Sequence, residues 1–222
     1  MQNIASKKFL TNFNSITFID IETSGTEPSK CGILEFGVLK VKPNLKDIIH
    51  EANFVIKPDN IENVYYDPGA LKVNNISLKE INDNGVSAKS LRSTIASYFT
   101  KDTLVIGHNF NFDFLFISKL LEDNEDNNYN NLLKPRYIDT SSLLLPLVMF
   151  GLIPKNTLYE ACKFFNINNQ GAHRAINDAY ITLEVFKSLT KFYKNLHSFS
   201  SNTDEMESNQ NIQSNLPTII QS

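Results

Sequence analysis

The chain of 222 residues has few cysteines, no long apolar stretch and no apolar segment at its start. Its two cysteines, Cys31 and Cys162, are too few for a disulfide framework and do not have the spacing of a metal site. We interpret both as buried small apolar residues. The longest nearly apolar stretch, Leu143–Pro154, contains two prolines and is too short to cross a bilayer, so we expect no membrane association. Residues 1–10 lack the apolar core of a signal peptide, which predicts an intracellular, cytoplasmic protein that is not secreted.

An excess of basic residues is also missing, since 21 Lys and Arg stand against 24 Asp and Glu, a net charge of −3. Proteins that bind nucleic acid often carry a basic field, so the average charge argues against that class. The distribution of the charges changes this reading. No basic residue follows Lys194, whereas three acids, Asp204, Glu205 and Glu207, lie beyond it. The remainder of the chain is balanced, and nucleic acid is therefore not excluded.

The composition divides the chain into one domain and two terminal segments. We predict an N-terminal extension at residues 1–13, a domain at 14–197, and a polar and acidic tail at 198–222 that is disordered. A short stretch of the tail, Gln213–Leu216, resembles peptides that bind sliding clamps. A clamp or a DNA polymerase is therefore one interpretation of the tail, and a segment that is only solvated is the other.

The pattern of apolar residues predicts an α/β fold with a mixed five-stranded sheet flanked by helices. The predicted strands are Ser15–Ile21, Ile33–Lys42, Ala52–Lys57, Thr103–Gly107 and Tyr137–Asp139. The predicted helices are Leu78–Asn82 after a Ser77 cap, Ser90–Phe99, Asn109–Leu121, Thr140–Phe150, Thr157–Phe165 and Arg174–Asn195.

Two acids stand on one face of the first predicted strand. In Phe18-Ile19-Asp20-Ile21-Glu22 the alternation of side chains places Asp20 and Glu22 on one face and the isoleucines on the other. A lone carboxylate inside an apolar strand is costly to desolvate, but two acids about 7 Å apart can share cations. The alternative is that Asp20 ends the strand and Glu22 caps a turn.

Asp113 lies among phenylalanines in the apolar helix that begins near Asn109. A buried acid there needs a partner, although Asn109 and Asp113 together could also form a solvent-facing stripe. A third group is His173 with Asp178, which converge if His173 lies in the loop that enters the last helix. An isolated histidine of this kind can equally be structural.

Taken together, the four acids and the histidine predict a site at one edge of the sheet. Carboxylates without a thiolate suit Mg²⁺ or Mn²⁺ rather than Zn²⁺. Two such ions can activate a water and stabilise the leaving oxygen of a phosphodiester. An imidazole beside them can accept the proton of the water.

These residues resemble the DnaQ-like, DEDDh 3′–5′ exonucleases, which have an RNase H-like fold. The resemblance rests on three motifs in the family's order, FIDIETSG at Phe18–Gly25, GHNFNFD at Gly107–Asp113, and HRAIND at His173–Asp178. It is strongest to the proofreading epsilon subunit type. The histidine of the third motif marks the DEDDh branch, and the resemblance covers about residues 14–195.

The resemblance implies a role for each matching residue. The acids Asp20, Glu22, Asp113 and Asp178 would hold two Mg²⁺ or Mn²⁺ ions, and His173 would be the general base. The residues that would contact the terminal nucleotide are Thr23, Ser24, Gly25, Asn74, Asn109 and Phe112. Asn74 departs from the family, because many relatives have a histidine in a V-H-G-I-T segment where this chain has Val73-Asn74-Asn75-Ile76-Ser77.

The expected activity is hydrolysis at the 3′ ends of nucleic acid, with release of 5′-mononucleotides from single-stranded DNA in proofreading or repair. One alternative is an exoribonuclease of the oligoribonuclease or RNase T type, because a 2′-hydroxyl is recognised by local pocket geometry. Another is a catalytically inactive module that binds nucleic acid or serves as a scaffold.

Overall fold

The structure is a computed structural model that describes residues 9–59, 61–122 and 136–206. The chain divides into two compact units, residues 1–187 and 188–222. The asparagine-rich stretch Asn124–Asn131 and the clamp-like stretch at Gln213–Leu216 lie outside the described residues.

The first unit is built on a mixed sheet, as the sequence predicts. Among the described residues six strands pair in the order β4-β3-β2-β1-β5-β6. These strands are β1 (Ser15–Thr23), β2 (Ile33–Val41), β3 (Ile48–Lys57), β4 (Val86–Ser87), β5 (Thr103–Gly107) and β6 (Arg136–Asp139). β1, β2 and β3 are antiparallel neighbours, while β5 is parallel to both β1 and β6. The prediction of five strands is wrong, because β4 is a two-residue strand parallel to β3 and too short to leave an apolar pattern.

The helices follow the predicted positions with one addition. They are α2 (Pro68–Asn74), α3 (Leu78–Asn84), α4 (Ala88–Ala96), α5 (Phe110–Glu122), α6 (Thr140–Met149), α7 (Leu158–Phe165) and α8 (Ala175–Met206), with a 3₁₀ turn at Ile61–Asn63. Ser77 caps α3 as expected, since its hydroxyl accepts a hydrogen bond from the amide of Glu80. α2 is absent from the prediction, although Asp67 caps it and Pro68 begins it, which is a common helix start.

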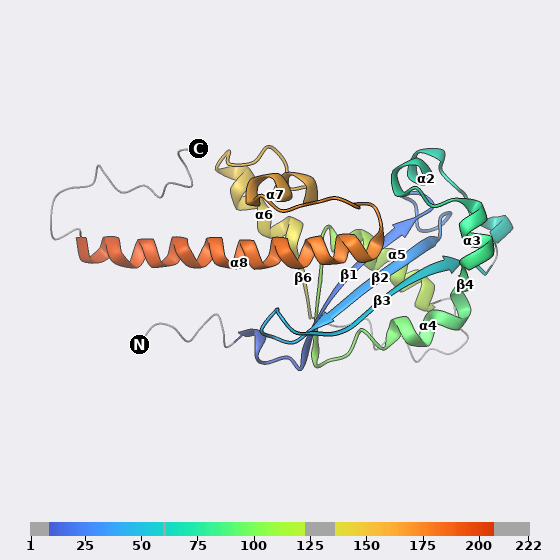
Figure 1. The fold of residues 1–222 in the computed structure, drawn as a ribbon, viewed down its shortest axis with the longest axis horizontal. Helices are drawn as coiled ribbons and strands as arrows, with labels where there is room; N and C mark the ends of the chain where they lie inside the picture. Colours follow the sequence, from blue (N-terminus) through green and yellow to red (C-terminus); the bar gives the residue numbers. More distant parts are fainter. Residues whose placement is uncertain (1–8, 60, 123–135, 207–222) are drawn as a thin grey trace. The chain divides into compact units, whose positions relative to one another are not determined.

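Two hydrophobic clusters cover the two faces of the sheet, whose strands are the arrows in Figure 1. Ile19 and Ile21 of β1 pack with residues of α4 and α5. Phe18 packs on the opposite face with Ala179, Leu183 and Phe186 of α8. Because side chains alternate along a strand, Asp20 and Glu22 lie on the same face as Phe18, towards the start of α8.

Both ends of the predicted domain need correction. Phe13 is buried in the cluster under α8, so the end of the N-terminal extension belongs to the core. α8 continues to Met206, since no Gly or Pro follows the predicted end of the helix at Asn195 before that residue. The tail predicted to be disordered from residue 198 therefore begins as helix, and residues 207–222 lie outside the described part. Within the described residues, no helix is long and apolar enough to span a membrane.

Gly37 of β2 marks the place where α8 begins against the sheet. A Cβ atom at this position would lie 2.3 Å from the carbonyl carbon of Ala175 and 2.3 Å from the amide nitrogen of Ile176. Gly37 is also the register partner of Asp20, so the first turn of α8 passes directly beside the acidic part of β1. The missing side chain is what allows that approach.

Gly37→Ala is expected to destabilise the protein by several kcal/mol, because the added methyl overlaps backbone atoms and not a movable side chain. Thermal unfolding of the variant tests this, with Gly151→Ala as the control. Gly151 has a φ of 70°, which costs an alanine about 1–2 kcal/mol, but no atom lies within 4 Å of its Cβ position, so Gly151→Ala measures backbone strain without atomic overlap. Equal stability of Gly37→Ala and the parent protein would contradict the close packing.

Candidate active site

The carboxylates of motifs one and two come together at the end of β1. Asp20 and Glu22 are partly exposed on β1, whereas Asp113 in the first turn of α5 is 3% exposed. These acids are close enough for their charges to interact. Burial raises the pKa of Asp20 well above its ordinary value, and the charges of Asp113, Asp178 and Glu22 raise it further. Burial and the charge of Glu22 likewise raise the pKa of Asp113.

The third motif completes the group from the start of α8. Asp178 lies in the first turn of the helix and is 8% exposed, while His173 is exposed and has a left-handed φ of 71°. The backbone amide of His173 donates to Oδ2 of Asp178 at 3.0 Å, so the loop folds back onto the helix. One ligand atom from each of Glu22, His173 and Asp178 lies within 4.8 Å of the others. The structure thus brings together all five residues that the sequence predicts as catalytic.

The arrangement fits a divalent cation. Oδ2 of Asp113 and Oδ1 of Asp178 are buried without a hydrogen-bond partner, which is costly for a carboxylate unless a cation or proton offsets it. Burial, followed by the charges of Asp178 and Glu35, raises the pKa of Glu22 to about 8. Carboxylate oxygens with an imidazole suit Mg²⁺ or Mn²⁺. Burial, followed by the charge of Asp178, raises the pKa of the nearby Cys162 thiol to about 11.

Metal-free protein is expected to lose stability as the pH rises from 6.5 to 8. With a pKa near 8 against an ordinary 4.5, folded Glu22 retains a proton that the unfolded chain releases, so this stabilisation is complete below pH 4.5 and lost by about pH 8. His108 has the opposite effect, since burial lowers its pKa from 6.5 to about 4, but that contribution is constant above pH 6.5. We expect a loss of about 1 kcal/mol per pH unit.

Thermal unfolding in EDTA between pH 6.5 and 8 measures this loss. Added Mg²⁺ is expected to restore stability, and to do so most at pH 8, because metal binding competes with protons for the carboxylates. Glu22→Gln should weaken the dependence without abolishing it, because Asp20, Asp113 and Asp178 also have raised pKa values. Stability that stays constant or increases with pH in EDTA would contradict the electrostatic description of the site.

The predicted nucleotide contacts at Thr23–Gly25 form a buried turn. The Ser24 hydroxyl is fully buried, donates to the Tyr65 carbonyl at 2.7 Å and accepts from the Gly32 amide at 3.0 Å. A Cβ at Gly25 would lie 2.6 Å from Sγ of Cys31. The side chain of Ser24 is therefore used internally. Its backbone is bonded as well, since its amide donates to the Gly32 carbonyl at 2.9 Å and its carbonyl accepts from the Asp67 amide at 2.7 Å. A cavity of about 300 Å³ adjoins Gly25 and is also lined by Tyr65.

Asn74 has an internal position that the sequence does not reveal. It is 2% exposed, its Nδ2 donates to the Thr23 carbonyl at 3.1 Å, and its Oδ1 accepts from the Ile76 amide at 3.1 Å. Both ends of the amide are used, so Asn74 supports the end of β1 and its side chain is not a surface contact. Asn75, which ends α2, has a left-handed φ of 55°, a conformation that asparagine tolerates.

Asn109 and Phe112 lie beside the acidic group at the start of α5. Asn109 is exposed, has a φ of 59°, and its amide donates to Oδ1 of Asp139 at 2.8 Å. Asp139 also caps α6, so one carboxylate ties together the starts of both helices. Phe112 is half-buried and packs its ring 5.0 Å from that of Phe116. Both predicted contacts therefore remain at the surface near the acids.

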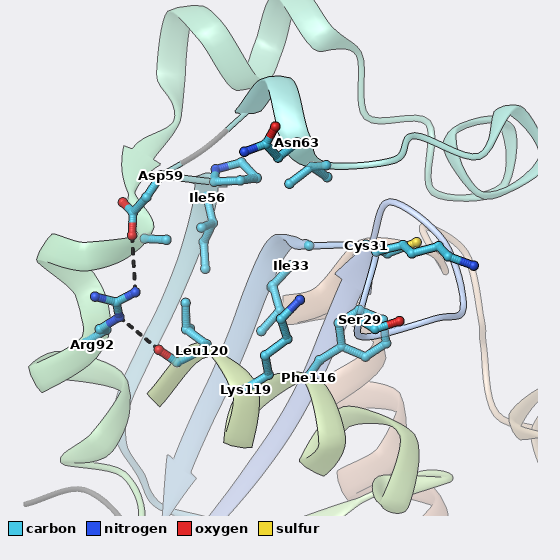
Figure 2. A pocket seen from close by; sticks show the side chains of 15 residues that line it. Ser29, Cys31, Ile33, Ile56, Asp59, Asn63, Arg92, Phe116, Lys119 and Leu120 are labelled. Carbon is cyan, nitrogen blue, oxygen red and sulfur yellow. Dashed lines mark hydrogen bonds and ion pairs between the residues drawn. The ribbon is translucent and has the colours of Figure 1, made fainter. Parts of the chain in front are cut away.

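A second cavity, of about 230 Å³, lies on the other face of the sheet between the 29–33 loop, α4 and α5. Figure 2 shows Arg92 in its wall, bonded to Asp59 and to the backbone carbonyl of Leu120. None of the predicted catalytic residues lines this cavity. The Arg92–Asp59 pair provides a partly buried ion pair away from the acidic site, with 8% and 30% of the two side chains exposed.

The family model described as Exonuclease matches residues 17–186, which include all three motifs. The chain belongs to this exonuclease family. A DNA polymerase III PolC-type protein of Ureaplasma parvum is 31% identical over 79% of the chain, but the chain spans only 12% of that relative. Ribonuclease T of Shewanella denitrificans is 27% identical, with 87% of this chain and 88% of the relative covered. The DNA polymerase III epsilon subunit of Aquifex aeolicus is 23% identical, with 82% and 84% covered.

Solved structures confirm the predicted fold of this exonuclease-family chain. Escherichia coli exonuclease I in complex with a dT13 oligonucleotide superposes with a TM-score of 0.72 at 19% identity, over 84% of this chain and 43% of that chain. The likeness at this identity is one of fold, and it confirms the RNase H-like architecture of exonucleases that the motifs predict. The substrate of this chain has to be inferred from its own site.

Proposed function

We propose that the chain is a metal-dependent 3′–5′ exonuclease that releases 5′-mononucleotides from single-stranded DNA. The observation that carries the proposal is the convergence of four carboxylates and one exposed histidine, His173, at the end of β1. Membership of the exonuclease family supports it. Relatives named as polymerase III epsilon and PolC-type proteins support a role in proofreading or repair, with a DNA polymerase as the proposed partner.

The proposed cofactors are two Mg²⁺ or Mn²⁺ ions. Asp20, Glu22 and Asp178 would hold one ion, Asp20 would be shared with the second, and Asp113 would complete the set. Bound divalent ions supply an activated water and stabilise the charge that develops on the leaving oxygen. The two buried carboxylate oxygens without hydrogen bonds support this assignment, because they have unused acceptor capacity.

The side chains and backbone near the proposed ions would transfer the proton and position the nucleotide. His173 is exposed beside Glu22 and Asp178, where its imidazole can accept a proton from the attacking water. Attack on phosphorus breaks the bond to the 3′ oxygen, which leaves a 3′-hydroxyl on the shortened strand and a phosphate on the released nucleotide. The backbone of Thr23–Gly25 would position the terminal nucleotide, and Phe112 would stack on a base.

RNA is the second candidate substrate. The relatives named ribonuclease T match this chain over 83–88% of their own length, whereas the PolC-type relatives match it over 12–13% of theirs. The similarity to relatives named ribonuclease T supports RNA as the second candidate.

Matched 5′-labelled DNA and RNA oligonucleotides of one sequence, digested side by side in Mg²⁺, test the proposal. We expect a ladder of products shortened one nucleotide at a time, with faster shortening of DNA. Faster shortening of RNA would replace DNA by the second candidate. An inert protein that still binds oligonucleotides would indicate a binding or scaffold module. An internal cut without intermediate products would exclude exonuclease activity.

A further inference from the structure

A fifth acid, Glu35 of β2, lies next to the proposed metal site and differs from the other four. It is 0% exposed, and both of its carboxylate oxygens accept hydrogen bonds. Nε of Arg174 donates to Oε1 at 2.9 Å and to Oε2 at 3.1 Å, and Nδ2 of Asn53 donates to Oε1 at 2.8 Å. The backbone amide of Ala175 donates to Oε2 at 2.8 Å. The acceptor capacity of Glu35 is thus used within the protein, unlike that of Asp113 and Asp178.

The position of Glu35 relates it to the reacting residues. It is the register partner of Glu22 on β1, as Gly37 is the register partner of Asp20. Two residues of β2 therefore lie beside the two acids of the first motif. Gly37 leaves room for the backbone of α8, and the carboxylate of Glu35 accepts a hydrogen bond from the first residue of α8. Ala175 is the first residue of that helix, and an anion at a helix N-terminus is favourable.

Arg174 connects Glu35 to the third motif, because its side chain binds Glu35 and its backbone carbonyl binds Asp178. It directly follows His173, and its carbonyl accepts the amide hydrogen bond of Asp178 at 3.0 Å, the first bond of α8. Its guanidinium also contacts Oε1 of Glu80 on α3 at 3.1 Å, so it is held between two carboxylates. His173 has a left-handed backbone conformation, which costs about 1–2 kcal/mol and persists only when neighbouring contacts hold it.

We propose that Glu35 is a positioning residue for the exonuclease reaction. Through the guanidinium of Arg174 and the amide of Ala175 it fixes residues 173–178, so that His173 and Asp178 face the acids of β1. Glu35 is not a metal ligand, because its oxygens are already bound by Arg174, Asn53 and Ala175. This inference rests on the proposed function, since the positioned residues are the ones that function requires.

Glu35→Gln and Arg174→Lys test the proposal, with Asp59→Asn as the matched control. Asp59→Asn breaks a partly buried arginine–carboxylate pair away from the acidic site, the Arg92–Asp59 pair drawn in Figure 2. We expect kcat of Glu35→Gln and of Arg174→Lys to fall about 10–100-fold with KM changed less than about threefold, as for residues that orient metal ligands. Asp59→Asn should change kcat less than about threefold.

Two further readouts separate positioning from a purely structural role. Calorimetric titration with Mn²⁺ should show about tenfold weaker binding for Glu35→Gln and unchanged binding for Asp59→Asn. In a His173→Asn background, Glu35→Gln should lower kcat by a clearly smaller factor than in the parent protein, because one of the two residues that it positions is already missing. Arg174→Lys retains a positive charge against Glu35 and serves as the second test if Glu35→Gln does not fold.

The proposal is overturned if the folded variants keep the kcat and Mn²⁺ affinity of the parent protein, or if Asp59→Asn loses as much as Glu35→Gln. A loss of kcat in the His173→Asn background as large as the loss in the parent protein also overturns it. If the parent protein degrades no oligonucleotide, the proposed function fails, and the Mn²⁺ titration still decides whether Glu35 positions the third motif.

Discussion

Replacing Asp20 by asparagine is expected to lower metal-dependent nucleotide release by at least about 10³-fold. Charge stabilisation by bound divalent ions supplies several kcal/mol in hydrolysis of this kind, and about 4 kcal/mol corresponds to a factor of about 10³ in rate. Asp20 is the acid of the first motif whose pKa is raised by four other carboxylates, namely Asp113, Asp178, Glu22 and Glu35, so it lies closest to the centre of the acidic group. Its loss removes the ligand proposed to be shared between the two ions.

The same substitution is expected to stabilise the metal-free protein. An asparagine carries no charge, so the repulsion among the acids and the cost of desolvating one carboxylate both disappear. Thermal unfolding in EDTA should therefore show a higher Tm for Asp20→Asn than for the parent protein at pH 8. Glu184→Gln, in an exposed pair with Lys187 on α8, is the control and should change neither property. An active Asp20→Asn, or one destabilised in EDTA, would contradict the assignment of Asp20.

Replacing His173 by asparagine is expected to lower kcat by about 10²–10⁴-fold, the usual contribution of a general base. Asparagine tolerates the left-handed backbone at this position, where φ is 71°, so the loop should keep its course. The imidazole is exposed and lies beside Glu22 and Asp178, which is consistent with access to a water and not with packing in the core.

Single-turnover rates and Mn²⁺ titration of His173→Asn measure the two expected effects. The rate of the chemical step should fall while Mn²⁺ binding changes little, because the four carboxylates remain. Unfolding should occur at nearly the same temperature as in the parent protein. A rate within about threefold of the parent protein would show that another group accepts the proton.

The acidic site could be predicted from sequence because its residues violate local patterns. Asp20 interrupts an apolar strand and Asp113 lies among phenylalanines, and such violations are costly unless a function requires them. The order and spacing of the motifs then identified the family. The average charge of −3 was misleading, since four of the acids form one cluster and three others lie beyond Lys194.

Glu35 resembles Asp20 in sequence, because each is an acid inside an apolar strand. The sequence alone does not distinguish the proposed metal ligand, Asp20, from the proposed positioning residue, Glu35. The difference lies in the partners: Glu35 faces Arg174, which is far from it in the chain, whereas Asp20 faces other acids. Asn74 is a second case. Its residue type fits a surface contact, but the fold turns it inward to the end of β1. Both distinctions depend on tertiary contacts.

Mass analysis of the nucleotide released from a DNA oligonucleotide, with the parent protein in Mg²⁺ and in EDTA, tests the central claim most directly. The account predicts that the 3′-terminal residue leaves first as a 5′-mononucleotide in Mg²⁺, with one oxygen of its phosphate derived from ¹⁸O-labelled water, and that nothing is released in EDTA. Release of nucleoside 3′-phosphates, or equal release in EDTA, would contradict a metal-dependent 3′–5′ exonuclease site.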